Sequence, residues 1–360
     1  MATKTPSPYK PDLEATFARR VAFCRREEPA AILAIFGVVG CGGTYHLRGI
    51  PDRRKMLAYN LERMRLQAEI DDDAVPLAQT HLGMGLFSAI FGSEIAWQPE
   101  EETSWSGPPF SAWPRDLERR LAFDLDNPYI ELARSTIAYY VEQSKAQFGV
   151  GLLETVDALN FVVALRGATN SYLDLYEHPR EVEQAMELGL EWNTRWLEMQ
   201  WREAGPFGGG WCSLGDWLPE KTVWLSVDAY SCCHPSAYVE RGQQYMQRLV
   251  DHFGLGWQHL HGNSVYLLPE IVKLRGLVAV QIGEDPGYPR PFDILRDLRR
   301  QSGDIPLQIG CTWQEFTRGL EEGSLTGGVE YHVSGAPSVE AANECAAHAR
   351  QYRDRALKPC

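Results

Sequence analysis

Short apolar segments alternate with longer amphipathic segments along most of the chain. We expect strands at nine apolar runs, which span residues 31–36, 74–79, 148–152, 205–211, 223–230, 257–261, 277–283, 307–311 and 328–333. Apolar residues at helical spacing predict helices over residues 52–70, 181–204, 236–253 and 338–353. Strands that alternate with helices are typical of a parallel α/β architecture.

The alternation predicts one α/β domain, because no Ser/Gly-rich linker and no internal repeat interrupts it. We expect a single (β/α)8 barrel of the TIM type over residues 31–360, with residues 1–30 as an N-terminal helical extension and an insertion near 93–125. A doubly wound open sheet is the alternative, since nine runs are one more than a barrel needs. In the last helix, Ser338 stands three residues before Ala341 and is expected to cap it.

Composition narrows the classes of function. The net charge of -13 and the pI near 5.2 argue against nucleic acid or anionic lipid as a partner, so a small-molecule substrate is favoured. No apolar run reaches the length of a membrane span, and the N-terminus lacks the apolar stretch of a signal peptide. The eight cysteines form no CxxC pair, which predicts reduced thiols and a cytoplasmic protein. The 11 Trp and 15 Tyr residues leave room for an aromatic homodimer interface.

Polar residues at the ends of the expected strands supply the candidate chemistry, because barrel active sites lie at the carboxyl ends of the strands. These residues are His81, Asp228, Tyr230, His259, His261, Gln281, Glu284, Cys311, Tyr331 and His332. Asp228 interrupts an apolar run, which is costly unless the carboxylate is paired or faces a pocket. The cluster 232–234 is read as a helix start, and the glycine-rich 37–46 as a loop without a phosphate-binding pattern.

The motif "HLHGN" raises the question of a metal site. His259 and His261 are two residues apart on an expected strand, so both imidazoles emerge on one face and can converge on an ion. A third ligand would come from a later strand end, with Cys311, His332 and Glu284 as the candidates. The alternative is a pair of hydrogen-bonded core histidines.

Several segments resemble the uroporphyrinogen decarboxylase-like superfamily. They span residues 91–97, 164–186, 223–240, 259–283 and 335–344, and the resemblance covers roughly residues 60–355 in the same order. Members of this superfamily include the decarboxylase of haem biosynthesis and zinc-dependent methyltransferases that pass methyl groups between corrinoid proteins and thiols. The resemblance implies a distorted (β/α)8 barrel.

Two departures from the family patterns bear on the reaction. The Arg-rich substrate-gripping stretch of the decarboxylase has no counterpart near the N-terminus. The methyltransferases carry a His-x-Cys-Gly-Asn zinc motif, and the chain has His259-Leu-His261-Gly262-Asn263, with His in place of Cys. Their second Cys falls in the loop after the last strand, where His332 is the nearest candidate here.

The resemblance therefore implies metal-assisted methyl transfer to or from a small or medium organic substrate. Zinc would be bound by His259 and His261, with His332 or Cys311 in addition, and a corrinoid would be carried by a partner protein. Asp228 and Tyr331 are the expected catalytic residues. The expected substrate-binding residues are His81, Tyr230, Gln281 and Glu284. The alternatives are decarboxylation without a cofactor and a non-catalytic ligand-binding barrel.

Overall fold

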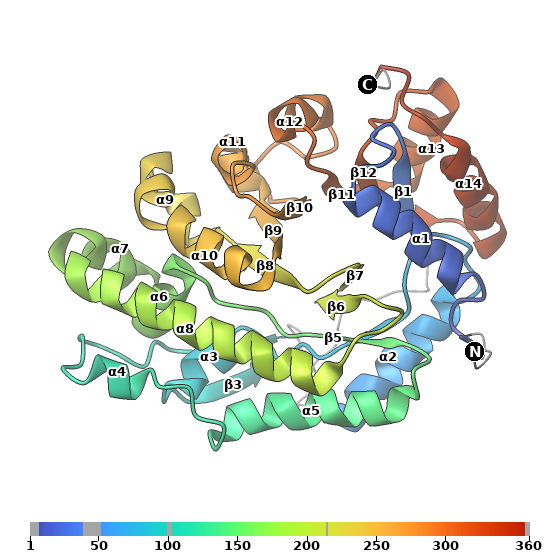
Figure 1. Cartoon of the computed structure of the whole chain (residues 1–360). Coiled ribbons are helices and arrows are strands. Elements are labelled where there is room, and N and C mark those ends of the chain that lie inside the picture. Colours follow the sequence, from blue (N-terminus) through green and yellow to red (C-terminus); the bar gives the residue numbers. More distant parts are fainter. Residues whose placement is uncertain (1–6, 39–51, 99–102, 214, 357–360) are drawn as a thin grey trace.

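A parallel sheet of six strands forms the centre of the protein. The structure is a computed structural model and describes residues 7–38, 52–98, 103–213 and 215–356. The sheet order is β1-β12-β11-β10-β9-β8, and every neighbouring pair is parallel (Figure 1). The strands are β1 (Ile32–Val38), β8 (Thr222–Ser226), β9 (Leu255–His261), β10 (Leu277–Gly283), β11 (Leu307–Thr312) and β12 (Val329–Ala336).

Three smaller sheets complete the strand content of the described residues. β2 (Leu77–Gln79) and β5 (Gly149–Gly151) form a parallel pair. β6 (Trp211–Ser213) and β7 (Asp216–Leu218) form a hairpin, and an isolated bridge from Leu152 to Ser213 links β5 with β6. β3 (Ile95–Gln98) and β4 (Thr103–Ser106) form a second hairpin in the expected insertion.

Side chains connect the six-stranded sheet with the β2–β5 pair. On one side, the Asp73 carboxylate accepts a hydrogen bond from the Ala34 amide at 3.0 Å. On the other side, the Thr155 hydroxyl donates to the Trp224 carbonyl at 2.6 Å. Within the described residues no strand ladder joins β1 to β2 or β5 to β8, so closure into a (β/α)8 barrel remains a prediction.

Helices pack around these strands. They are α1 (Leu13–Cys24), α2 (Arg53–Gln67), α3 (Gly85–Ile90), α4 (Leu117–Arg120), α5 (Pro128–Ser144), α6 (Leu159–Arg166), α7 (Ala168–Glu177), α8 (Pro179–Ala204), α9 (Pro235–Arg241), α10 (Gln243–Phe253), α11 (Leu268–Ile271), α12 (Leu295–Ser302), α13 (Trp313–Glu322) and α14 (Val339–Gln351). Two 3-10 helices, η1 (Asp228–Cys232) and η2 (Gly262–Leu267), follow β8 and β9. In Figure 1, α13 and α14 lie beside β1 and β12 at the right, while α5 and α8 run across the lower part of the view. None of the described helices is both long and apolar enough to cross a membrane.

Side chains at successive positions of β12 point to opposite faces of the sheet. In β12, the Tyr331 ring packs edge-on against Phe316 of α13, with ring centroids 5.4 Å apart. The neighbouring Glu330 instead forms an ion pair with Arg20 of α1 at 3.2 Å. The strand therefore has one face toward the helices and one toward a polar interior, as the twofold repeat of a strand requires.

Eight of the nine expected strands overlap observed parallel strands. The run 205–211 is wrong as a strand, because most of it precedes the β6–β7 hairpin as a turn. The helix expected over 236–253 is broken at Gly242, where an added Cβ would lie 2.5 Å from the Tyr230 ring. The cap by Ser338 is confirmed by its hydrogen bond from the Ala341 amide. The expected glycine-rich loop at 37–46 lies mostly outside the described residues.

Candidate metal centre and cavity

Three side chains from two neighbouring strand ends converge on one point. His259 and His261 of β9 have ring centroids 4.7 Å apart, and Asp228 follows β8 as the first residue of η1. The His261 Nε2 atom lies 3.8 Å from Asp228 Oδ1. In the described part of the chain, these three residues form the one group of potential metal ligands whose donor atoms all lie within 4.8 Å of one another.

Neighbouring groups hold both imidazole rings in place. His259 Nδ1 forms a short hydrogen bond with Gln281 Oε1 of β10. His261 Nδ1 lies 3.0 Å from Oδ1 of Asp285, and the other oxygen of this carboxylate accepts a hydrogen bond from the Asn263 amide. Because each Nδ1 atom has a protein partner, the Nε2 atoms are the natural ligand atoms of both rings.

This donor set fits a zinc ion. Zinc accepts imidazole nitrogen and carboxylate oxygen, and three protein ligands leave a position for substrate. Burial lowers the pKa of His259, which favours the neutral imidazole that a metal requires. Asp228 is the third potential ligand in this group. The candidates that the sequence suggests for that role are instead Cys311, His332 and Glu284.

A cavity of about 620 Å³ opens beside these residues. Asp228 and His259 line it together with Ser226 of β8 and Glu154, which follows β5. The remaining walls come from α3, β4, α6 and α7. This volume lies within the usual range for small-molecule sites, so the potential metal ligands stand at the edge of a substrate-sized space.

The cavity-lining residue Glu154 forms an imidazole–carboxylate pair with His81. His81 Nδ1 lies 2.5 Å from Glu154 Oε1, and these residues follow β2 and β5. The Glu154 charge raises the pKa of His81. Burial alone would raise the pKa of Glu154, but the charge of His81 outweighs it and the pKa is lowered. Sequence reasoning missed Glu154, although it follows an apolar run as the other candidates do.

The backbone on both sides of Asp228 is fixed by Asn160 of α6. Its amide nitrogen donates to the Ser226 carbonyl at 3.1 Å, and its amide oxygen accepts from the Ala229 N–H at 2.9 Å. The nearby Asp157 carboxyl contacts the Ser226 amide at 3.3 Å, and burial raises its pKa to about 7. Neither Asn160 nor Asp157 was a candidate from the sequence, because both lie beyond the end of an expected strand.

The structure does not bring three of the expected residues into this site. Tyr331 is fully buried, and its hydroxyl bonds to the backbone of Thr326. Cys311 is also buried, and burial raises its thiol pKa to about 12. Tyr230 packs against Tyr238, with ring centroids 5.5 Å apart. Tyr331 and Cys311 occupy strand positions that face the helices, which corrects their placement in the pocket.

Other expected residues have partners of their own. His332 Nε2 lies 3.0 Å from Glu330 and 2.9 Å from Gln308, and His332 is not in the metal-ligand group. Glu284 lies 3.3 Å from Arg290 Nε. The prediction that a helix starts at residues 232–234 is confirmed for His234. Its ring accepts a hydrogen bond from the Ser236 amide and so caps α9.

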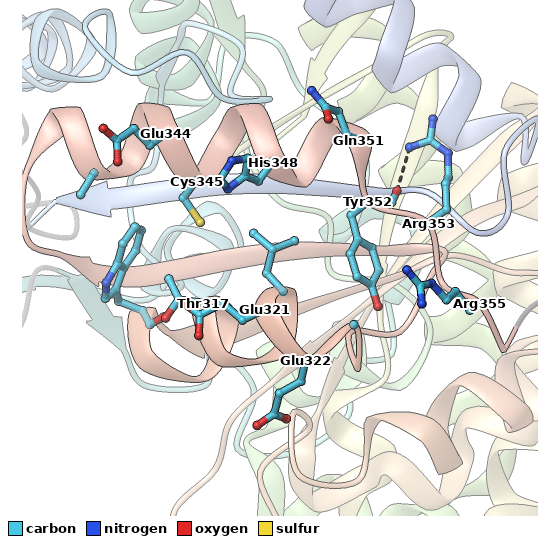
Figure 2. A pocket seen from close by; sticks show the side chains of 14 residues that line it. Thr317, Glu321, Glu322, Glu344, Cys345, His348, Gln351, Tyr352, Arg353 and Arg355 are labelled. Carbon is cyan, nitrogen blue, oxygen red and sulfur yellow. Dashed lines mark hydrogen bonds between the residues drawn. The ribbon is translucent and has the colours of Figure 1, made fainter.

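A second depression, of about 800 Å³, lies between α13 and α14 (Figure 2). Cys345 and His348 of α14 and Glu321 of α13 line it, and no member of the metal-ligand group does. Burial raises the pKa of Cys345 to about 11, so its thiol stays protonated and unreactive near neutral pH. The depression is therefore a groove between helices, separate from the candidate metal centre.

The fold is similar to that of a methyltransferase from Methanosarcina mazei. The TM-score is 0.63 at 14% sequence identity, and the superposition covers 93% of this chain and 98% of that chain. At this level of identity the likeness shows a shared fold. No family model matches the chain, and no curated protein matches it.

Proposed function

We propose that the protein is a zinc-dependent methyltransferase of the uroporphyrinogen decarboxylase-like type, built on a distorted (β/α)8 barrel. The observation that carries the proposal is the convergence of His259, His261 and Asp228 at the wall of a substrate-sized cavity. The fold shared with a methyltransferase over most of both chains supports it. A metal site alone would also suit a hydrolase, and the likeness of fold favours methyl transfer.

In this proposal His259, His261 and Asp228 hold the zinc ion. Bound zinc lowers the pKa of a coordinated thiol and so supplies a thiolate for methyl transfer. Gln281 and Asp285 keep the two imidazole rings oriented through their Nδ1 atoms. The neutral form of His259, favoured by its burial, matches its role as a ligand.

The other partners follow from the same reading. A small organic molecule would occupy the cavity, and a corrinoid carried by a separate protein would exchange the methyl group at the mouth. We place this chemistry in the cytoplasm, where cysteines without a disulfide pattern stay reduced.

Metal analysis tests the proposal. The purified protein should contain about one zinc ion per chain. His261→Ala and Asp228→Ala should lose it, while the matched control His252→Ala, an exposed histidine paired with Glu198 on the outer helices, should retain it. The variants should keep the circular dichroism spectrum of the parent. Protein that contains no zinc and takes up none on addition would contradict the proposal.

Activity is tested with methylcobalamin and a free thiol. The methyl–cobalt bond breaks, a sulfur–methyl bond forms, and the thiol releases its proton, so the products are cob(I)alamin and a methyl thioether. The absorbance change of the cobalamin reports the reaction. Transfer by the parent protein and by His252→Ala, but not by His261→Ala, is the expected result.

A further inference from the structure

A buried hydroxyl beside the metal ligands has no partner among the described residues. Ser226 is 7% exposed, lines the cavity, and its Oγ atom forms no hydrogen bond there. It pairs in register with His259 on the neighbouring strand and stands two residues before Asp228. Buried hydroxyl groups are nearly always hydrogen-bonded, so this atom points to a partner that a ligand supplies.

The charges on the described walls limit what that ligand can be. The charged side chains that line the cavity are the carboxylates of Glu154 and Asp228, and Glu154 is paired with His81. No Lys or Arg is among the described lining residues. The proposed zinc ion could neutralise one carboxylate of a ligand, but each further carboxylate would lose its hydration without gaining a cation on these walls, which is strongly unfavourable.

Aromatic and aliphatic side chains make up much of the rest of the cavity wall. Trp224 lies beside the His259 ring, with centroids 5.9 Å apart and planes 19° apart. Trp105 and Tyr172 contribute further rings. The backbone of Trp105 lies close to Gly85 of α3. An added Cβ at Gly85 would meet the Trp105 backbone at 2.6 Å, so this approach requires glycine. Such flat aromatic surfaces favour a ligand that contains a ring.

We propose that the cavity binds an uncharged, ring-sized organic molecule whose single oxygen or sulfur atom accepts a hydrogen bond from the Ser226 hydroxyl beside the metal centre. The proposal deepens the proposed function and rests on it, since this molecule would be the organic substrate of the methyl transfer. It excludes a polycarboxylate of the kind that a porphyrinogen decarboxylase binds.

Three ring compounds test the proposal on the zinc-loaded protein, with tryptophan fluorescence as the reporter. Anisole carries one ether oxygen, toluene carries no oxygen, and isophthalate carries two carboxylates on the same ring. Anisole should bind about tenfold more tightly than toluene, because it satisfies the buried hydroxyl. Isophthalate should bind more weakly than both.

Two variants isolate the hydroxyl. Ser226→Ala should weaken anisole binding about tenfold and leave toluene binding and the zinc content unchanged. Ser135→Ala, which removes a hydroxyl on α5 outside the cavity, should change neither affinity. Isophthalate binding as tight as that of anisole, or an unchanged anisole affinity in Ser226→Ala, would overturn the proposal. Absence of zinc would instead overturn the proposed function, and the three affinities measured on that protein would still decide the ligand class.

Discussion

The Nδ1 atom of His261 lies 3.0 Å from Oδ1 of Asp285, a carboxylate that follows the adjacent strand β10. This contact fixes the ring so that Nε2 is the atom left for a metal. We predict that Asp285→Asn lowers zinc affinity about tenfold to a hundredfold. Loss of a hydrogen-bond partner that orients a metal-binding histidine typically weakens metal affinity by this factor. Competition with a chromogenic chelator measures the affinity.

The control for this prediction is Asp297→Asn, which neutralises an exposed carboxylate on α12. It should leave zinc affinity unchanged. Equal affinities for Asp285→Asn and the parent protein would show that the carboxylate does not orient His261 for metal binding.

Asn160 is expected to control the position of Asp228. Asn160→Ala removes the hydrogen bonds to the Ser226 carbonyl and the Ala229 amide, which flank Asp228. We predict that zinc affinity falls about tenfold while His259 and His261 still bind the ion. Calorimetric titration with zinc measures this, and Asn170→Ala on α7 is the control, because its amide nitrogen donates to the Arg166 carbonyl at the end of α6. A parent-like affinity in Asn160→Ala would refute the role.

The His81–Glu154 pair should make stability depend on pH. The pKa of His81 is raised above its ordinary 6.5, so its contribution is present below pH 6.5 and is lost as the pH rises through the raised value. The pKa of Glu154 is lowered below 4.5, so its contribution is present above pH 4.5 and is lost as the pH falls through the lowered value. The pair therefore stabilises most between pH 4.5 and 6.5.

Urea unfolding of the parent protein and of Glu154→Gln checks this dependence. The difference in free energy of unfolding should be about 2 kcal/mol near pH 5.5 and should shrink toward pH 9 as His81 loses its proton. A difference that is constant over this range would mean that the two groups do not form an ion pair.

A buried network around Arg20 should be important for stability. The guanidinium of Arg20, on α1, forms ion pairs with Asp216 of the β6–β7 hairpin and with Glu330 of β12. We predict that Arg20→Ala lowers the free energy of unfolding by about 3–5 kcal/mol, because it leaves two buried carboxylates without their cation. Chemical unfolding measures it. Arg25→Ala, an exposed position just after the same helix, should change it by less than about 0.5 kcal/mol.

Most strand positions could be read from the sequence, because the parallel strands are largely buried and appear as apolar runs. The run 277–283 coincides with β10, and 257–261 lies within β9. The run 205–211 could not be placed in this way. Its apolar residues include Phe207, whose ring packs against Phe17 of α1, and such a contact between distant segments leaves no local pattern.

The candidate site was only partly predictable. His259, His261 and Asp228 could be nominated, because polar residues at strand ends are costly unless they face a pocket. Tyr331 and His332, however, are adjacent on β12 and cannot both face the interior of a regular strand. His332 faces the interior because it lies on the same side of the strand as Glu330. The partner of Glu330 is Arg20, which is more than 300 positions away in the chain, so no local pattern reveals this orientation.

Among the described residues, single side chains such as Thr155 and Asp157 connect β5 with β8, and no strand ladder does. Bonds in a ladder support one another, whereas an isolated side-chain bond can open without disturbing either strand. Amide protons at this seam should therefore exchange with solvent sooner than those inside the six-stranded sheet. Thr155 lines the cavity, so exchange at this seam would report on the stability of one cavity wall.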